Sequence, residues 1–214
     1  MVGELDKLRT KLDSTLWIVA VAALVAAGCD RAAEAGARAE KSVVPPGTII
    51  DSILPPGEAL RRFQSDLPFV TELADAPRGR DKLVSEFIKA LERTDTAALA
   101  RLRVSKSEYA FLYYPSSVYS HKPYELAPDI AWLLSQQNSQ KGAIRVLRRL
   151  GGRNLRFDGY ACGASAREHE NVYWRDCQVR YVDPASSVPV TRQLFGAIMQ
   201  RGDRYKFLSY ANDF

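Results

Sequence analysis

The sequence predicts an α+β fold, in which N-terminal helices pack on a curved antiparallel sheet that is preceded by a membrane-anchoring segment. Apolar residues recur at helical spacing between residues 81 and 150, the hydrophobic period changes to two after Gly152, and an uncharged apolar run lies near the N-terminus. Helices followed by antiparallel strands are typical of α+β domains. We therefore expect an anchor at 1–29, a linker at 30–56 and one globular domain at 57–214.

The anchor consists of the polar residues Met1–Thr15 followed by the apolar run Leu16–Gly28. This run of 13 residues falls short of the ~20 needed to span a bilayer and matches the ~7–15 of a secretory signal. It ends in Val-Ala-Ala-Gly-Cys at 25–29, which resembles the lipobox of bacterial lipoproteins, although that family prefers a larger aliphatic residue at Ala26. The resemblance implies that Cys29 accepts a diacylglyceryl group.

An uncleaved signal anchor starting near Leu16 is the alternative, because the acidic residues before it are unusual in a cleaved signal. Both interpretations attach the chain to one side of a membrane. We expect the domain to face the periplasm or the exterior of the cell envelope. Asp30, directly after Cys29, resembles an inner-membrane retention signal and favours the outer face of the inner membrane. Residues 30–56 are rich in Ala, Gly, Pro and charge without a period, which is typical of a flexible linker.

The helical part of the domain is defined by apolar stripes and by capping residues. Asp95 is placed to cap one helix, Ser105 and Glu108 have the spacing of a capping box, and Gly151-Gly152 is a C-terminal stop. The strongest apolar stripe comprises Leu83, Val84, Phe87, Ile88 and Leu91. The predicted helices are Gly57–Leu67, Asp81–Arg93, Thr96–Arg103, a short one into Phe111 and Leu112, and Pro128–Leu150.

The strand part follows Gly152 and contains four predicted strands. They are Leu155–Cys162, Val172–Val182, Val190–Gln200 and Tyr205–Tyr210. The polar stretch Gly163–Asn171 separates the first two, and Arg201-Gly202-Asp203-Arg204 joins the last two. The Arg-Gly-Asp triplet is integrin-like, but a hairpin tip needs glycine in any case, so we interpret it as a turn.

Two cysteines remain if Cys29 carries lipid, and an even pair in an oxidising compartment favours a disulfide. Cys162 and Cys177 are equidistant from a midpoint inside the polar stretch between their strands. A symmetric hairpin would therefore place them opposite each other, within the reach of a disulfide. Two free buried thiols are the alternative. A zinc site is disfavoured, since His169 is the only histidine close by and such a site needs four ligands.

A family resemblance rests on the helix at 81–93, its follower at 96–103 and the closing hairpin Gln200–Asp213. These segments resemble the start and end of nuclear transport factor 2-like domains, over about residues 81–214. The resemblance implies a cone-like fold with an open mouth. The superfamily includes ketosteroid isomerases, polyketide cyclases, dehydratases and non-catalytic binding or assembly modules, so the fold alone does not decide the function. The helix at 128–150 and the Tyr/Pro-rich loop before it are not standard parts of that family.

An isomerase-type site would need a buried carboxylate beside a tyrosine or a protonated acid. Asp158, Asp176, Tyr113 and Tyr160 are candidates, but they are also ordinary strand and loop residues without diagnostic spacing. His121 and His169 are interpreted as surface histidines. The sequence contains no phosphate-binding glycine loop, serine elbow or metal signature. We therefore expect no catalytic residues, no metal site and no cofactor.

Basic residues cluster late in the chain. Arg145, Arg148 and Arg149 share a helical face, with Ile144, Leu147 and Leu150 on the other, and Arg153 and Arg156 follow. The full chain has a net charge of +5, and removal of residues 1–28, with three basic and three acidic side chains, leaves that charge unchanged. Anionic headgroups or an acidic partner are the natural counter-charges, a solvated helix face is the alternative, and nucleic acid is excluded by the compartment.

The second candidate contact surface is a loop with four tyrosines, Tyr113, Tyr114, Tyr119 and Tyr124, and two prolines within 12 residues. Tyrosine offers a large contact area with a polar tip, which suits recognition. The alternative is that these rings close the mouth of the cone and belong to its core.

Together, these features predict a non-catalytic accessory or assembly subunit that docks on a protein partner in an envelope membrane complex. A small-ligand-binding protein or a degenerate isomerase- or cyclase-type enzyme that uses the cone pocket is the alternative.

Overall fold

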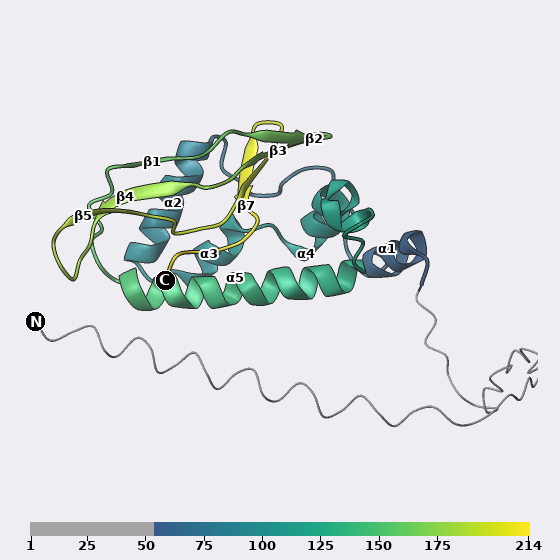
Figure 1. The fold of residues 1–214 in the computed structure, drawn as a ribbon, viewed down its shortest axis with the longest axis horizontal. Helices are drawn as coiled ribbons and strands as arrows, with labels where there is room; N and C mark the ends of the chain where they lie inside the picture. The colour runs from purple at the N-terminus through teal and green to yellow at the C-terminus, as the bar shows by residue number, and fades with distance from the viewer. Residues whose placement is uncertain (1–53) are drawn as a thin grey trace, which may run out of the picture. The chain divides into compact units, whose positions relative to one another are not determined.

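The computed structural model describes residues 54–214 of the chain. The expected signal or signal anchor at 1–29, the lipidation at Cys29, and the linker up to residue 53 lie outside the described residues. The domain has the predicted α+β class, with five α-helices and two antiparallel sheets that do not close into a barrel (Figure 1). The helices are α1 (Pro56–Gln64), α2 (Arg80–Glu92), α3 (Thr96–Leu102), α4 (Lys106–Glu108) and α5 (Pro128–Leu150).

The predicted helices and their caps are confirmed. The Asp95 side chain accepts a hydrogen bond from the Ala98 amide at the start of α3. Ser105 and Glu108 form a complete capping box at the start of α4. That short helix continues into the π-helical turn Tyr109–Tyr113, followed by 3₁₀ turns at Tyr114–Ser116 and Val118–Ser120. Reciprocal capping satisfies amide donors that would otherwise be unpaired at a helix start, so these boundaries are readable from sequence.

The sheet region differs from the predicted single sheet of four strands. Seven strands form two sheets, in the orders β1-β4-β5 and β2-β3-β6-β7. The strands are β1 (Gly159–Ala161), β2 (Ala166–Glu168), β3 (Asn171–Trp174), β4 (Gln178–Val182), β5 (Pro189–Arg192), β6 (Ile198–Arg201) and β7 (Arg204–Phe207). The prediction of one continuous sheet was wrong because two of the predicted strands, Val172–Val182 and Val190–Gln200, each break in the middle.

Backbone conformation explains the central break. Asp176, between β3 and β4, has φ +52°, a left-handed conformation that interrupts the pleat of a strand. The stretch 163–171, predicted as a polar turn, contains β2, and the two-residue tip is His169-Glu170. The turn between β6 and β7 is confirmed, since Gly202 lies at its tip with φ +59°.

The hairpin register follows the predicted midpoint. Gly159 pairs with Arg180 in one ladder and Ala166 pairs with Tyr173 in the other, and both pairs are symmetric about the His169-Glu170 tip. Cys162 and Cys177 lie opposite each other between the two ladders and form a disulfide. The disulfide prediction is therefore confirmed, and the bond joins the two strands at the point where the sheets separate.

Loss of this disulfide should destabilise the domain. The bond closes a loop with a sequence separation of 15 residues, for which the chain-entropy model gives about 3 kcal/mol. We expect Cys177→Ala combined with Cys162→Ala to lower the free energy of unfolding by about that amount in urea denaturation. An unchanged denaturation midpoint would contradict the expected effect. A reducing agent should lower the midpoint of the wild-type chain and leave that of the double variant unchanged.

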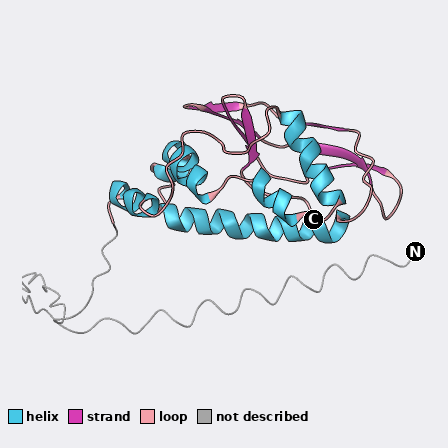
Figure 2. Ribbon diagram, turned by 180° about the vertical axis from the view of Figure 1, so that it is seen from behind, coloured by secondary structure: helices cyan, strands magenta, loops and turns pink. Residues whose placement is uncertain are grey.

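Two apolar clusters form the core. The larger one brings together α2, α3, the second half of α5, and strands β4, β6 and β7, and its centre is Phe87, with the Phe195 and Phe207 rings each 5.3 Å away. The stripe predicted for α2 is buried within it. The smaller cluster contains Tyr109, Tyr114, Ala131, Tyr173 and Met199. Helix α5 runs along the side of the domain away from the sheets in both views (Figures 1 and 2), and it contributes to both clusters.

Candidate functional site

The C-terminal half of α5 displays the predicted basic residues. Arg145, Arg148 and Arg149 are exposed on this helix, and Arg153 and Arg156 are exposed directly after it. Among the ion pairs of residues 54–214, none involves these five guanidinium groups. Their positive charge is therefore not neutralised within the described domain, which favours attraction of an anionic surface.

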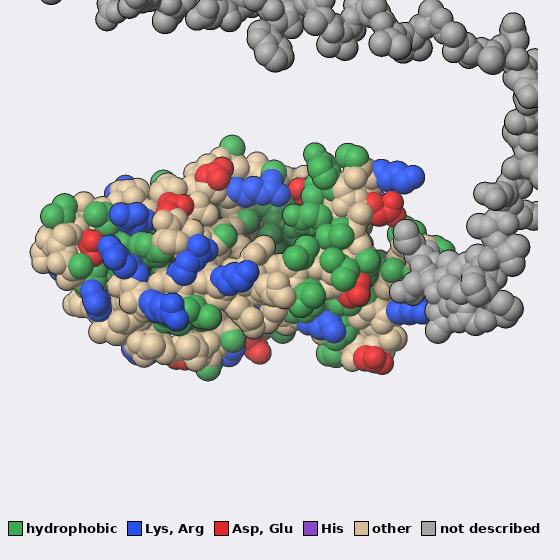
Figure 3. Space-filling model, turned by 60° about the horizontal axis from the view of Figure 1, so that its bottom comes forward, with side chains coloured by type: hydrophobic (Ala, Val, Ile, Leu, Met, Phe, Trp, Pro, Cys, Tyr) green, Lys and Arg blue, Asp and Glu red, His purple; other side chains and the backbone are tan. Residues whose placement is uncertain are grey.

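The N-terminal half of the same helix displays apolar side chains instead. Ile130, Leu133 and Leu134 have exposed fractions of 43%, 49% and 48%. At 100° per residue they project in the same direction as Lys141 and Arg148. Figure 3 shows hydrophobic side chains gathered toward one end of this side of the molecule and Lys and Arg toward the other. We call this surface the outer face of α5; it comprises Ile130, Leu133, Leu134, Lys141, Ile144, Arg145 and Arg148.

One residue of the predicted helix pattern lies on a different side from the one expected. Ile144 was assigned to the apolar face opposite the arginines, whereas its side chain is 50% exposed. Leu150 is buried and Leu147 is half-buried, as that assignment requires. The prediction for Ile144 was wrong because position 144 lies one turn before Arg148 and 11 residues after Leu133, both of which project outward.

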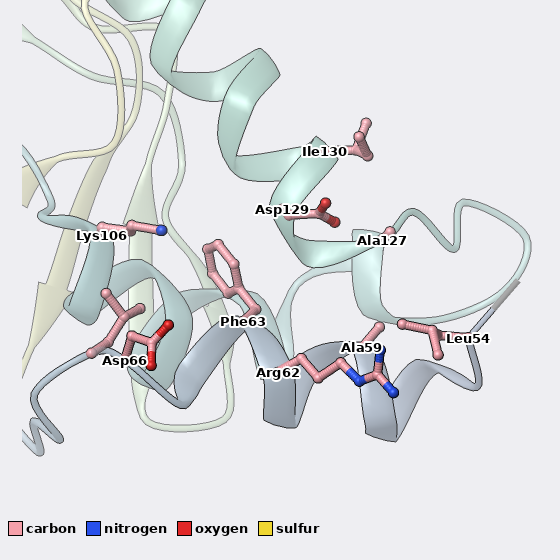
Figure 4. Close-up of a pocket in the computed structure, with 10 residues that line it drawn as sticks. Leu54, Ala59, Arg62, Phe63, Asp66, Lys106, Ala127, Asp129 and Ile130 are labelled. Carbon is pink, nitrogen blue, oxygen red and sulfur yellow. The ribbon is translucent and has the colours of Figure 1, made fainter. Parts of the chain in front are cut away.

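A hollow of about 590 Å³ lies at the apolar end of the outer face, between α1 and the start of α5. Figure 4 shows Phe63 of α1 between Lys106 on one side and Asp129 on the other. The Lys106 Nζ lies 5.1 Å from the centre of the Phe63 ring. Leu54 and Ile130 also line this hollow and are themselves exposed. The hollow thus offers an apolar wall with charged groups of both signs at its rim.

The four predicted loop tyrosines divide into two groups. Tyr114 is buried, and its hydroxyl donates a hydrogen bond to the Leu126 carbonyl at 2.7 Å. Tyr113 is half-buried with its ring centre 5.9 Å from that of Tyr173, and burial raises its pKa well above the ordinary value. Tyr119 and Tyr124 are exposed. Two of these tyrosines thus lie in or against the core, and two lie on the surface.

A second hollow, of about 470 Å³, lies between this loop and α5. Tyr113 and Tyr119 line it together with Leu134 of the outer face and Arg175. Leu134 thus belongs both to the outer face and to the wall of this hollow. The exposed Tyr119 and the apolar half of α5 therefore form adjoining surfaces.

The four candidates for an isomerase-type site are not brought together. Asp158 is exposed and pairs with Arg180 at 3.0 Å, and Asp176 is also exposed. Tyr160 donates a hydrogen bond to Asp81 at 2.7 Å and packs against the larger core cluster, whereas Tyr113 packs against the smaller one. Burial and the hydrogen bond to Asp81 raise the pKa of Tyr160 to about 12. These positions thus provide no buried carboxylate beside a tyrosine donor.

The buried carboxylate of the described core belongs to Glu108, which sequence reasoning assigned only to a cap. Its two oxygens accept hydrogen bonds from Lys206 Nζ at 2.8 and 3.0 Å, and Lys206 is itself buried. Glu108 also accepts from the amides of Ala74 and Ser105. With all its lone pairs engaged, Glu108 is a structural group and not a free acid or base.

His121 and His169 are both exposed, as expected of surface histidines. Within residues 54–214, no three His, Cys, Asp or Glu side chains are grouped as metal ligands would be. Within the same range, no helix combines the length and the apolar character needed to cross a membrane.

No protein-family model matches this chain, and neither the curated proteins nor the solved structures provide a match. The resemblance of residues 81–214 to nuclear transport factor 2-like domains therefore stays a prediction. The class that fold and surface define is an α+β domain with an exposed helix that is apolar at one end and basic at the other.

Proposed function

We propose that this chain is a membrane-tethered, extracytoplasmic and non-catalytic module that docks as an accessory or assembly subunit on an envelope membrane-protein complex. The observation that carries the proposal is the outer face of α5, where exposed apolar side chains continue into basic ones that form no ion pair within residues 54–214. Clustered apolar side chains on a surface are typical of protein contacts. The tether is the N-terminal segment ending at Cys29, so docking takes place next to the outer face of the inner membrane.

The partner that fits this surface is a protein with an apolar groove and an acidic border. The groove would take Ile130, Leu133 and Leu134, and the acidic border would pair with Arg145 and Arg148. Apolar contacts at the centre supply most of the affinity, whereas complementary charges set the orientation and raise the association rate. The tether adds to this by confining the domain to the membrane surface, which raises its effective concentration near a membrane-embedded partner.

Photo-crosslinking in intact cells tests the proposal directly. A photoreactive phenylalanine analogue is placed at Leu133, and at Val188 as a matched control, because Val188 is an exposed apolar residue in the loop between β4 and β5. We expect a discrete adduct with one membrane protein from position 133 and none from position 188. Crosslinking to lipid only, or equal adducts from both positions, would reject docking on a protein.

Charge reversal tests the basic end of the face. We expect Arg145→Glu combined with Arg148→Glu to lower the yield of the position-133 adduct by about tenfold, because like charges now oppose the acidic border. Arg167→Glu is the control, since Arg167 is exposed on β2 and forms none of the ion pairs of the described domain. An unchanged yield in the double variant would show that the arginines do not contribute to the contact.

Small-ligand binding is the second candidate function, and the surface hollows favour it. The resemblance to nuclear transport factor 2-like domains would place such a ligand in the pocket of a cone-like fold, where a degenerate isomerase or cyclase would also act. The exposure of Asp158 and Asp176 gives the enzymatic version no support. A ligand-binding role would be compatible with docking, because the hollows lie beside the outer face of α5 and do not replace it.

A further inference from the structure

One half-buried cation of the described domain, Arg103, has no counter-charge. Arg103 follows directly after α3, and its guanidinium is largely withdrawn from water, which lowers the pKa of the group. Its Nη2 donates a hydrogen bond to Gln136, and the guanidinium carbon lies 5.2 Å from the centre of the Trp132 ring. No carboxylate of residues 54–214 lies within 4.0 Å of it.

The same guanidinium also has an unused donor. Across residues 54–214, Nη1 of Arg103 is the one buried side-chain nitrogen or oxygen that lacks a hydrogen-bond partner. Nearly all buried polar groups in folded proteins are paired, because an unpaired buried donor is costly and an unpaired buried charge more so. An acceptor that carries negative charge would remove both costs at once.

Arg103 lines a cleft that suits the rest of such a ligand. The cleft lies between α3 and α5 and has a volume of about 400 Å³, which is within the range of small-molecule sites. Its walls are mostly apolar, and polar side chains from Thr96, Gln136 and Gln140 accompany Arg103. The apolar lining consists of Leu99, Ala100, Ala143, Ile144 and Leu147.

We propose that this cleft binds a small amphipathic carboxylate, with the carboxylate paired to the Arg103 guanidinium and the hydrocarbon tail against the apolar walls. A carboxylate is the charged acceptor that best matches a guanidinium. Because Nη1 is withdrawn from the surface and Nη2 donates to Gln136, the ligand would reach the guanidinium by displacing the side chains that cover it. Tyr210 also lines the cleft, but its hydroxyl does not donate to the ligand, because it already donates to the Leu99 carbonyl at 2.6 Å. The inference goes beyond the docking function and does not depend on it.

Calorimetric titration with hexanoate tests the proposal. The full chain is embedded in nanodiscs of neutral phosphatidylcholine, and empty nanodiscs correct for partition into lipid. Hexanamide has the same tail without the charge, and acetate has the charge without the tail. We expect saturable binding of hexanoate, with at least tenfold weaker binding of both control compounds. No saturable binding of hexanoate, or equal binding of hexanamide, would overturn the proposal.

Two variants locate the binding. We expect Arg103→Met to weaken hexanoate binding at least tenfold. Arg101→Met changes an exposed arginine in the last turn of α3 and should leave binding unchanged. Ala100→Trp fills the cleft from its exposed rim without altering Arg103, so it should also abolish binding even if Arg103→Met fails to fold. Hexanoate binding that survives Ala100→Trp would place the ligand elsewhere and overturn the assignment. Because the titration contains no partner protein, its result is independent of docking.

Discussion

Replacing Glu108 with glutamine should cost the domain about 3–5 kcal/mol of unfolding free energy, the range measured when one partner of a buried ion pair is removed. The side chains of Glu108 and Lys206 are 1% and 6% exposed, so Lys206 would keep its charge with no carboxylate beside it. The retained amide oxygen can still accept one of the backbone hydrogen bonds. The loss should appear as a lower urea midpoint followed by circular dichroism.

A double-mutant cycle separates the ion pair from the surrounding packing. Glu108→Gln combined with Lys206→Met removes both charges, and we expect it to be less destabilising than the sum of the two single changes. Asp203→Asn is the exposed counterpart, since Asp203 pairs with Arg78 on the surface. Exposed pairs contribute roughly 0–1 kcal/mol. Equal losses at the buried and the exposed pair would contradict the expected role of burial.

Replacing Gly142 with alanine should destabilise the domain by more than about 3 kcal/mol, above the usual range for overpacking. A Cβ at this position would lie 1.8 Å from the backbone carbonyl oxygen of Tyr210. That carbonyl has little freedom to move, because the Tyr210 amide donates to Ser139 and the Asn212 side chain donates to the Gly142 carbonyl. Thermal denaturation of the variant measures the effect.

Gly57 is the matched control, because it is also a helical glycine with a negative φ, and a methyl group added there would meet nothing within 4 Å. Gly57→Ala should be neutral or stabilising by up to about 1 kcal/mol, since alanine favours the helix. If Gly142→Ala were as stable as Gly57→Ala, the close contact between α5 and the C-terminal segment would be refuted.

The helical half of the domain is predictable because its signals are local. Asp95, Ser105 and Glu108 satisfy backbone donors within three residues of themselves, so their spacing alone reports the helix starts. The disulfide is predictable for a related reason. The register of a hairpin is fixed by its turn, and both cysteines lie within the same hairpin.

The division of the sheet is not predictable from the same patterns. Tyr173, Cys177, Val179 and Tyr181 are apolar at alternate positions, with Arg175 as the exception, which predicts one strand over Val172–Val182. Asp176 within it nevertheless adopts a left-handed backbone conformation. A pattern of apolar residues does not report the backbone conformation of one polar residue between them. Nor does it report the ion pair of Glu108 and Lys206, which are 98 residues apart.

The candidate site is partly predictable. Exposure of the five arginines follows from helical spacing and from the turn after α5. The apolar half of the outer face was missed, although Ile130, Leu133 and Leu134 project in the same direction as Arg148 on an ideal helix. A signal was therefore present in the sequence. It was not recognisable as a surface because three apolar residues at helical spacing are the usual mark of a buried face.

Helix α5 holds the two apolar clusters together. Ala131 near its start packs in the smaller cluster, and Val146 and Leu150 near its end pack in the larger one. A partner that binds the opposite side of this helix would stabilise both clusters against local opening. Amide hydrogen exchange should then slow in regions that the partner never touches, including α2 at one end of the domain and the π-helical turn at the other.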